Sequence, residues 1–309
     1  MKHLQHKHRT KQRRLRLKVS AVIILLFIIA LFAGHIVYNN PWILSRQFVF
    51  SETAPKGTTL TVTFLDVGQG NCVLAESDGH YMLIDGGDNT HSSFVVSYLK
   101  KHGIKQLDYV LVSHYDADHL SGIIGVLYNY PTDTLLAPDY IGDTKTYQSY
   151  LNCLETQKIT PVHPKTGTSY PLGNAEFTIV CPEHYDYEEE NNLSLGIRLT
   201  DGSNSFLILG DAQSQSESAM LRNHIEISSD VYMVSHHGSS SSSSEKFLKA
   251  VNPQYAVISV GADNDYGHPT QKVLSRLEAL HVQILRTDQN GTITAYSTND
   301  GISWNLEKN

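Results

Sequence analysis

The sequence predicts an α/β fold in which two mixed β-sheets face each other and helices cover their outer sides, preceded by one transmembrane helix. Short apolar and β-branched segments of strand length recur between residues 58 and 298. The first ones are arranged as hairpins and later ones alternate with helical segments, and this order occurs in both halves of the domain. Near the N-terminus, a basic segment precedes twenty mostly apolar residues.

The apolar segment spans residues 19–38, and at a rise of roughly 1.5 Å per residue it covers about 30 Å, the thickness of a bilayer core. Residues 1–18 contain eight Lys and Arg and no acid. A signal peptide would have a shorter apolar region and a small-x-small cleavage site, which Leu31-Phe32-Ala33 matches poorly. We therefore expect a single-pass anchor in the cell membrane, with the N-terminus in the cytoplasm and the remainder extracytoplasmic.

Charge is distributed unevenly along the chain. Residues 39–57 contain proline and glycine residues that interrupt regular structure, which predicts a linker. Residues 58–309 are predicted to form one domain. Because residues 1–18 hold eight of the 24 Lys and Arg, residues 39–309 carry 16 cations against 31 acids, a formal net charge of −15. Such a domain repels polyanions, nucleic acid included, unless metal ions or a basic groove offset the field.

The expected elements follow from periodicity and from turn residues. Residues 58–65 alternate and are rich in β-branched side chains, and Gly103 ends a helical segment. The expected strands are 58–65, 72–76, 81–84, 107–112, 176–180, 194–200, 206–209, 231–234, 255–260, 282–286 and 292–296. The expected helices are 91–102, 144–157, 213–223, 244–250 and 270–280, with a further helix starting near residue 120.

The three cysteines, Cys72, Cys153 and Cys181, are an odd number and form no Cys-x-x-Cys pair. A cysteine zinc site is therefore disfavoured. A domain of this size needs no disulfide to build a core, and a Cys72–Cys181 bridge is left open.

Two imidazoles and two carboxylates lie within six residues, in the motif His114-Tyr115-Asp116-Ala117-Asp118-His119. The motif separates an apolar strand from a helix start. Imidazole with carboxylate suits Zn²⁺ or Mn²⁺ rather than Ca²⁺, which takes oxygen ligands. His114 and Asp116 alternate on extended chain and point the same way, while Asp118 and His119 follow a bend and can face a second ion. The structural alternative is a polar loop whose acids cap the helix.

Further polar residues follow other apolar strands, at Asp66, Asp85, Asp211 and the pair His236-His237. Side chains at strand ends are held at one edge of a sheet, where several of them can converge on one site. The six-serine run 239–244 comes directly after the histidine pair. It either lines the mouth of the site or is a flexible lead into the next helix, and the sequence favours neither.

These motifs resemble those of the metallo-β-lactamase superfamily and, more closely, of the hydrolase domain of the ComEC competence proteins. The resemblance covers about residues 58–298 in family order, and SHYDADH is its most specific element. The matching stretches are FLDVGQG (64–70), LIDGG (83–87), SHYDADHLSG (113–122), NNLSL (191–195), GDA (210–212), SHHGS (235–239) and GHP (267–269).

The resemblance implies two divalent metal ions, Zn²⁺ or Mn²⁺, and a role for each motif residue. It assigns His114 and Asp116 to one ion, Asp118 and His119 to the other, Asp211 as a bridge, and His236 to complete the second site. Asp118 also has a catalytic role, and His237 and His268 face substrate as proton donors or phosphate contacts. Asp66, Asp85 and Asn192 support the ligands, although Asp85 alternatively braces loops only and His268 is alternatively a surface histidine.

The chain departs from the family pattern in three places. The superfamily usually has histidine at the position of Asp116 and a third histidine near Asn191 and Asn192, so the first site here is richer in oxygen, which favours Mn²⁺. The competence family usually has aspartate at the position of Asn71. One predicted span cannot form a DNA pore, so DNA uptake would require a separate channel protein.

The expected function is a membrane-anchored, extracytoplasmic, metal-dependent hydrolase of phosphodiesters, with single-stranded DNA as the substrate that the resemblance implies. The acidic domain keeps a second hypothesis open, an envelope phosphoesterase acting on phosphorylcholine or teichoic-acid groups. A third hypothesis is a non-catalytic binding module, which the six complete ligand positions argue against. β-Lactam hydrolysis is disfavoured because the first site lacks the histidines that the superfamily usually has at the position of Asp116 and near Asn191 and Asn192.

Overall fold

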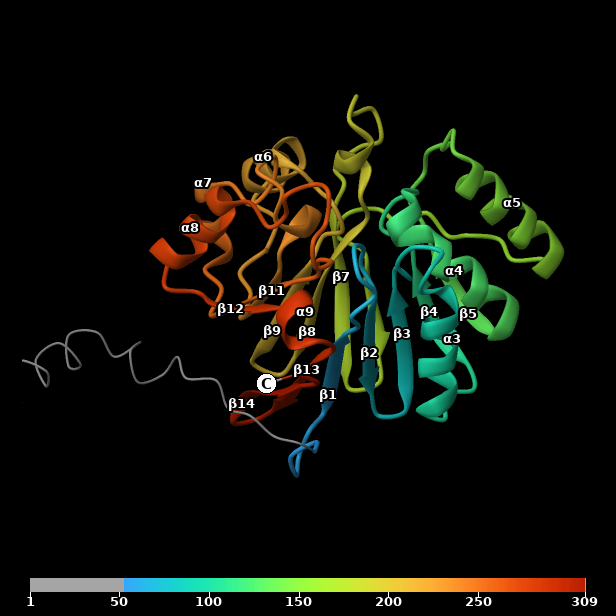
Figure 1. The fold of residues 1–309 in the computed structure, drawn as a ribbon, viewed down its shortest axis with the longest axis horizontal. Coiled ribbons are helices and arrows are strands. Elements are labelled where there is room, and N and C mark those ends of the chain that lie inside the picture. Colours follow the sequence, from blue (N-terminus) through green and yellow to red (C-terminus); the bar gives the residue numbers. More distant parts are fainter. Residues whose placement is uncertain (1–52, 309) are drawn as a thin grey trace, which may run out of the picture. The chain divides into compact units, whose positions relative to one another are not determined.

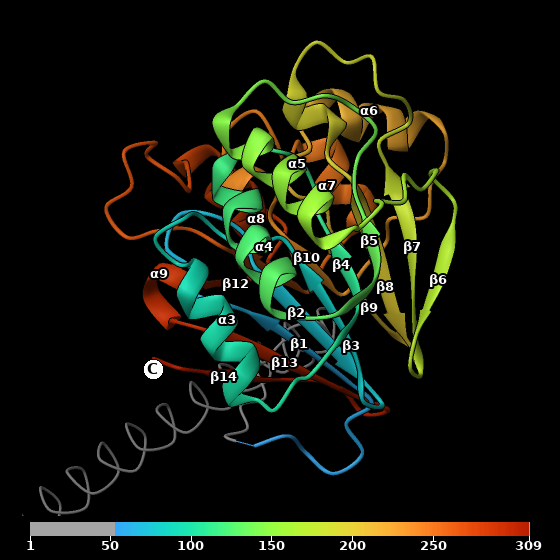
Figure 2. The same cartoon turned by 90° about the vertical axis from the view of Figure 1, so that its right-hand side faces the viewer.

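The computed structural model describes residues 53–308, which form two seven-stranded mixed sheets packed face to face with helices on both outer sides (Figures 1 and 2). This arrangement confirms the predicted αββα sandwich of two mixed sheets with outer helices. The first sheet has the order β14-β13-β1-β2-β3-β4-β5 and the second the order β12-β11-β10-β9-β8-β7-β6.

The elements have the following bounds. The strands of the first sheet are β1 (Leu60–Phe64), β2 (Val73–Ser77), β3 (His80–Ile84), β4 (Leu107–Leu111), β5 (Thr132–Leu136), β13 (Ile293–Thr298) and β14 (Gly301–Leu306). Those of the second are β6 (Ser169–Leu172), β7 (Ala175–Cys181), β8 (Gly196–Asp201), β9 (Asn204–Ile208), β10 (Val231–Met233), β11 (Tyr255–Ile258) and β12 (Gln283–Arg286). The helices are α3 (Ser92–Lys101), α4 (Ala117–Asn129), α5 (Lys145–Gln157), α6 (Ser214–Arg222), α7 (Glu245–Val251), α8 (Gln271–Ala279) and α9 (Thr287–Asn290), with short 3₁₀ turns η1 (Glu190–Leu193) and η2 (Ser235–Gly238).

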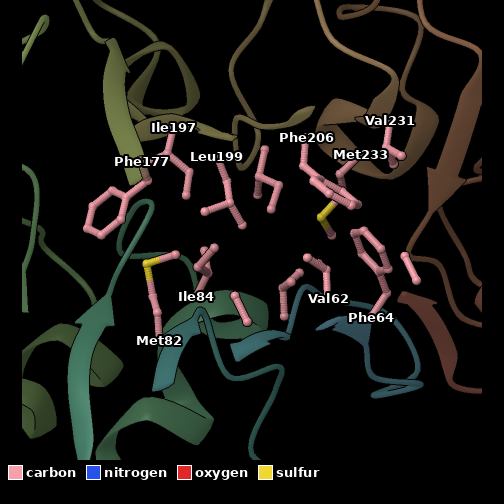
Figure 3. Close-up of a cluster of buried hydrophobic side chains, with 14 of the residues drawn as sticks. Val62, Phe64, Met82, Ile84, Phe177, Ile197, Leu199, Phe206, Val231 and Met233 are labelled. Atoms are coloured by element: carbon pink, nitrogen blue, oxygen red, sulfur yellow. The ribbon is translucent and has the colours of Figure 1, made fainter. Parts of the chain in front are cut away.

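The main core fills the space between the sheets. In Figure 3, Val62 and Phe64 of the first sheet point toward Phe206 and Met233 of the second, and all four are almost fully buried. A second apolar cluster packs the outer face of the first sheet against α3, α4 and α5, and a third packs the second sheet against α6, α7 and α8. Both sheets are thus covered by helices, which accounts for the continuous apolar runs in their parallel strands.

Strand direction determines where the polar strand ends lie. In the first sheet β1, β3 and β4 run the same way, because β1 and β3 are each antiparallel to β2 and β4 is parallel to β3. In the second sheet β9, β10 and β11 are parallel neighbours. Hydrogen bonds join this edge across the sandwich. Ser259 Oγ, after β11, donates to Gly70 O, after β1, at 2.7 Å, and Leu195 N, just before the antiparallel β8, donates to Ser113 O, after β4, at 2.7 Å. The loops that carry the predicted site residues therefore meet at one edge.

Helix α4 is fixed against the loop after β3 by direct backbone contact. Gly86 N donates to His119 O at 2.8 Å, and Gly122 N donates to Gly87 O at 3.2 Å. A Cβ on Gly122 would lie 1.9 Å from Gly86 O. Only glycine allows this approach, which places the loop after β3 beside His119.

Replacing Gly122 with alanine is expected to destabilise the domain by about 1–3 kcal/mol, because the added methyl group forces two backbones apart. The same displacement moves Asp85 away from His119, so metal affinity should fall as well. Denaturant unfolding and metal titration of the purified protein measure the two effects.

Gly125, one turn further along α4, provides the matched control. A Cβ there would meet Ser92 Cβ at 3.7 Å, an ordinary contact. Gly125→Ala should therefore stabilise the helix by about 0.5–1 kcal/mol and leave metal affinity unchanged. Equal effects of the two substitutions would contradict the proposed role of the Gly86–Gly122 contact.

The structure differs from the predicted elements at several points. Helix α4 begins at Ala117, with Asp116 at the N-cap, so Asp118 and His119 lie in its first turn, whereas the helix was expected to start near residue 120, after them. Asp116 makes no capping hydrogen bond, which removes the alternative that this acid serves only as a cap. Strands β5, β6 and β14 were not predicted: β5 and β6 are short and carry exposed polar residues, and polar residues interrupt the apolar side chains of β14.

Two other sequence expectations can be compared with the described residues. All three cysteines are buried and free, so the Cys72–Cys181 bridge is absent. Within residues 53–308, no helix has both the length and the apolar character that a membrane span requires. The predicted span at 19–38 and the basic segment at 1–18 lie outside the described residues.

Candidate metal centre

Histidine and aspartate side chains from three strand ends converge in two overlapping groups. In the first, ligand atoms of His114, His119 and Asp211 lie within 4.8 Å of one another. In the second, ligand atoms of Asp118, His119 and His237 do the same. Five of the predicted site residues are thus brought together from the loops after β4, β9 and β10.

The separations match those of ligands that share an ion. His119 Nε2 lies 3.3 Å from Asp211 Oδ1, and His237 Nε2 lies 3.3 Å from Asp118 Oδ2 and 3.6 Å from Asp211 Oδ2. Two atoms each bound to one tetrahedral ion at about 2.0–2.1 Å would be separated by about 3.3 Å. The two oxygens of Asp211 face both groups, the placement that a bridging ligand needs.

Ring orientation favours metal binding at Nε2 of all three histidines. His237 Nδ1 donates to Ser259 O at 2.8 Å, and His119 Nδ1 donates to Asp85 Oδ2 at 2.8 Å. His114 Nδ1 lies 3.0 Å from Ser113 Oγ, whose hydroxyl is donated to Asp85. These partners hold the protons on Nδ1 and leave each Nε2 lone pair directed into the site.

Four buried atoms at this place have no hydrogen-bond partner: Nε2 of His114, His119 and His237, and Oδ1 of Asp211. An unsatisfied buried polar atom costs about 1–3 kcal/mol. A divalent cation bound by lone pairs would satisfy all four, so the residues present fit a metal ion.

Electrostatics at the site are dominated by the carboxylates. Burial alone would raise the pKa of Asp211, but His119 and His237 hold that pKa well below its usual range. Burial alone would lower the pKa of His119, but Asp211, Asp118 and Asp85 raise that pKa well above its usual value. In the metal-free protein a proton on His119 therefore compensates part of the carboxylate charge, and a cation would replace that proton.

Metal binding is accordingly expected to release protons and to weaken as the pH falls. The bound form needs neutral His119, whose pKa is raised, so apparent affinity should rise with pH up to that raised pKa. Calorimetric titration with Zn²⁺ in two buffers of different ionisation enthalpy measures the proton count. Affinity that does not change between pH 6 and pH 8 would contradict the assignment of His119 as a ligand.

The two residues of the pair His236-His237 differ in their burial and in their place at the site. Both residues have left-handed backbone, with φ of 54° and 53°, a conformation that costs non-glycine residues about 1–3 kcal/mol. The turn directs His237 into the buried second group, whereas His236 remains partly exposed, with Nε2 3.7 Å from Asp211 Oδ2. The structure thus places His237 in the buried candidate group, and His236, predicted as a ligand, lies at the opening beside Asp211.

The remaining predicted residues surround the two groups. Asp116 points toward His114 as predicted, with Oδ2 3.5 Å from His114 Nε2, and its side chain is 45% exposed. Asn192 Oδ1 accepts from the backbone of Gln213 and Ser216, which fixes the start of α6 just after Asp211. Asp116 therefore lies at the outer side of the first group, and Asn192 holds the loop behind the bridging position.

Three other predicted positions have different surroundings. Asp85 holds both Ser113 and His119, so it does more than brace loops. Asp66 accepts from Gly68 N within its own loop and pairs with a lysine near the C-terminus, without contact to a ligand. His268 packs against His236, with ring centroids 5.7 Å apart, and is thus next to the centre rather than an isolated surface residue.

The serine run 239–244 forms an ordered turn at the site, which supports the first of its two interpretations. Buried Glu217 accepts hydrogen bonds from the backbone of the run, including Ser243 N. Ser241 Oγ lies 3.3 Å from His236 Nδ1. The end of the run also caps α7, so it leads into that helix as well.

Sequence reasoning missed the residues that hold the ligands through distant contacts. Ser259 binds His237, Ser194 Oγ accepts from Asp211 N at 3.3 Å, and Glu217 anchors the serine turn. Ser113 is adjacent to His114 and could have been found from its place in the motif. One feature of the sequence could have indicated Glu217, because it is an acid on the otherwise buried face of a helix. Its partner, Ser243, is 26 residues away, so the sequence did not show what it binds.

An αββα sandwich with paired histidine and aspartate groups at one sheet edge defines a class of metal-binding hydrolase folds. The chain belongs to the metallo-β-lactamase superfamily, whose family model matches residues 65–262. Members of this superfamily are metal-dependent hydrolases, and the candidate ligands described above lie within the matched region.

Comparison with curated proteins confirms the resemblance to ComEC-type competence proteins. ComE operon protein 3 of Bacillus subtilis (strain 168) is 30% identical over 250 residues, which is 75% of this chain and 32% of that protein. Competence protein ComA of Neisseria gonorrhoeae is 30% identical over 261 residues, 82% of this chain and 35% of that protein. The chain thus spans about a third of the length of these relatives.

Among solved structures, the diiron β-hydroxylase CmlA from Streptomyces venezuelae superposes with a TM-score of 0.51 and 14% identity. The match covers 79% of this chain and 55% of that one. At this identity the similarity shows the shared fold alone.

Proposed function

We propose that the chain hydrolyses phosphodiesters with two bound divalent ions, Zn²⁺ or Mn²⁺. The observation that carries the proposal is the set of four buried, unpartnered ligand atoms that face one another across two overlapping groups. Burial of four polar atoms without partners costs free energy. A bound cation would remove that cost, whereas a purely structural role would not. Two groups that share His119 and are spanned by Asp211 suit a pair of ions.

The residues divide into those that hold the ions and those that face the opening. When bound, a pair of divalent ions supplies hydroxide near neutral pH and stabilises negative charge on an attacked phosphoryl oxygen. Burial lowers the pKa of His236 and of His268, so both are neutral at pH 7. We assign His236 and His268 to hydrogen-bond the substrate and leaving-group oxygens, a role that the buried His237 cannot fill.

A phosphodiester substrate is favoured by the ligands at the outer side of the first group. Asp116 supplies a carboxylate there, and the neighbouring His114 imidazole lowers its pKa, so it is charged at neutral pH. Oxygen-rich sites suit Mn²⁺ and phosphate chemistry. The competence relatives support single-stranded DNA as one substrate to test.

The proposal is tested on the purified full chain by metal analysis and a substrate panel. We expect on the order of two ions per chain after incubation with Mn²⁺ or Zn²⁺. Bis-p-nitrophenyl phosphate should be hydrolysed, and nitrocefin should not. Bound metal without turnover of any substrate would favour the non-catalytic binding module, and absence of metal would overturn the site itself.

A second candidate, an envelope phosphoesterase, is favoured by the charge of the loop after β7. This loop, which stands at the top of Figures 1 and 2, carries five acids between residues 183 and 190 and no Lys or Arg. Negative charge there opposes the approach of a polyanion but not of a small or zwitterionic phosphoester. Turnover of p-nitrophenyl phosphorylcholine with no cleavage of single-stranded DNA would support this candidate.

For placement in the cell, we propose a cytoplasmic segment at 1–18, a membrane anchor at 19–38, a linker at 39–57 and an extracytoplasmic hydrolase domain at 58–309. The basic and apolar composition of the first 38 residues supports this topology. Protease added to intact cells should degrade the domain, whereas protection of the domain would contradict the topology. Action in DNA uptake would involve a separate channel protein as partner.

A further inference from the structure

A row of three aromatic rings leads from the surface to the metal centre. Tyr266, in the loop between β11 and α8, is 70% exposed. Its ring is stacked on His268, with centroids 5.7 Å apart and an interplanar angle of 22°. His268 in turn meets the ring of His236 edge-on, with centroids 5.7 Å apart, and His236 Nε2 lies 3.7 Å from Asp211. The tyrosine therefore extends a stack that begins at the site.

The loop that carries Tyr266 is held in one conformation by Asn264. Its side-chain amide donates to His268 O at 2.7 Å and to Gly261 O at 3.0 Å, and its Oδ1 accepts from His268 N at 3.0 Å. These bonds close residues 261–268 into a turn. Because the ring is presented by a closed turn, binding on it would cost little ordering of the protein.

Charge around the opening limits what can bind there. The segments 183–190 and 261–268 contain seven acids and no Lys or Arg. The first approaches the centre through Glu190, whose pKa is raised by burial and by the nearby carboxylates of Asp116 and Asp143. The second segment carries Asp263 and Asp265, one on each side of Asn264. A long strand, which needs several cationic contacts to its phosphates, is disfavoured by such a rim.

We propose that Tyr266 is a stacking platform for the base of a nucleotide-sized phosphodiester. This inference rests on the proposed hydrolase function and specifies its substrate class. A base would stack on the face of the Tyr266 ring that His268 leaves open, and the sugar and phosphate would extend past His268 and His236 toward the metal centre. The acidic rim then excludes the continuation of a long strand.

The test uses the full chain and three substrates: the thymidine dinucleotide, the same compound with abasic tetrahydrofuran residues in place of both nucleosides, and a thymidine 20-mer. Loss of a base stack costs on the order of tenfold in affinity. We therefore expect Tyr266→Ala to raise KM for the dinucleotide by about tenfold with kcat little changed. The abasic compound should show no difference between wild type and variant, and Tyr266→Phe, which keeps the ring, should behave as wild type.

Tyr128 provides the matched control, because it is 48% exposed and lies near the end of α4, away from the His and Asp groups. Tyr128→Ala should leave every KM unchanged. An equal rise in KM for the abasic compound, or no rise for the dinucleotide, would overturn the stacking role. A higher kcat/KM per bond for the 20-mer than for the dinucleotide would overturn the size limit.

Binding of a 2-aminopurine nucleotide separates this inference from the hydrolase proposal. Its fluorescence is quenched when it stacks on an aromatic ring, and the measurement needs no turnover. Quenching by wild type that is lost in Tyr266→Ala, in a protein that hydrolyses nothing, would retain the platform and reject the hydrolase. Turnover of substrate without quenching of the nucleotide would retain the hydrolase and reject the platform.

Discussion

Replacing Asp118 with alanine is expected to lower the hydrolytic rate by about 100-fold or more, the loss typical of removing one preorganised charge-stabilising group. Asp118 lies in the first turn of α4, with Oδ2 3.3 Å from His237 Nε2 and 3.8 Å from His119 Nε2. Its removal leaves Asp211, which faces both groups, as the carboxylate nearest to His237. Nearby histidines hold its pKa well below the usual range against the effect of burial, so the group is charged throughout the neutral range.

The measurement is kcat with bis-p-nitrophenyl phosphate, together with metal content. Ser121→Ala is the matched control, since its hydroxyl only donates to Ala117 O within the same helix. Unfolding should also be followed, because an acid in the first turn stabilises α4 by about 0.3–1 kcal/mol. A variant with unaltered kcat would remove Asp118 from the mechanism.

Replacing Asp85 with asparagine is expected to weaken metal binding by about 10- to 100-fold while the fold is retained, the range found when a partner of a metal-binding histidine is lost. The carboxylate accepts from His119 Nδ1 at 2.8 Å and from Ser113 N and Oγ, both at 2.7 Å. An asparagine can retain the bond from Ser113 N at Oδ1, but it presents an N–H donor at the position of Oδ2, which accepts from His119 and from Ser113 Oγ in the wild type. The proton then moves to Nε2, the atom that faces the metal.

Asparagine suits this test because it tolerates the left-handed backbone at position 85, where φ is 55°. Asp201 offers a matched control, since it is also buried and accepts two hydroxyl hydrogen bonds at 2.6 Å, from Thr59 and Ser297. Asp201→Asn should change stability without changing metal affinity. Equal metal affinity of Asp85→Asn and wild type in a competition titration would show that His119 is oriented by other contacts.

Strands buried on both faces were the most predictable part of the fold. Residues 206–209 and 231–234 are continuous apolar runs, and β9 and β10 occupy nearly the same positions. Strand β14 was missed because Ser303 and Asn305 interrupt its apolar side chains, and it gains its place only by pairing with β13. The local sequence pattern was thus enough to predict strands that are completely buried. It failed for a strand that is stabilised mainly by pairing with its neighbour.

The candidate site divides in the same way. His114, Asp116, Asp118 and His119 were recognisable because four ligand types fall within one short motif. The choice between His236 and His237 was not, since neighbouring identical side chains differ only in the direction that the backbone turn gives them. Ser259 and Glu217 act through contacts 22 and 26 residues away, which leave no local pattern.

The sequence by itself determined the αββα class, the order of the strands that end in polar residues, and the chemistry of the ligands. Periodicity and residue type are local properties, and they are sufficient for those conclusions. Tertiary structure alone decided which imidazole faces inward, which carboxylate orients it, and which aromatic ring extends the site. These depend on backbone direction and on contacts between distant loops, which arise only when the two sheets pack together.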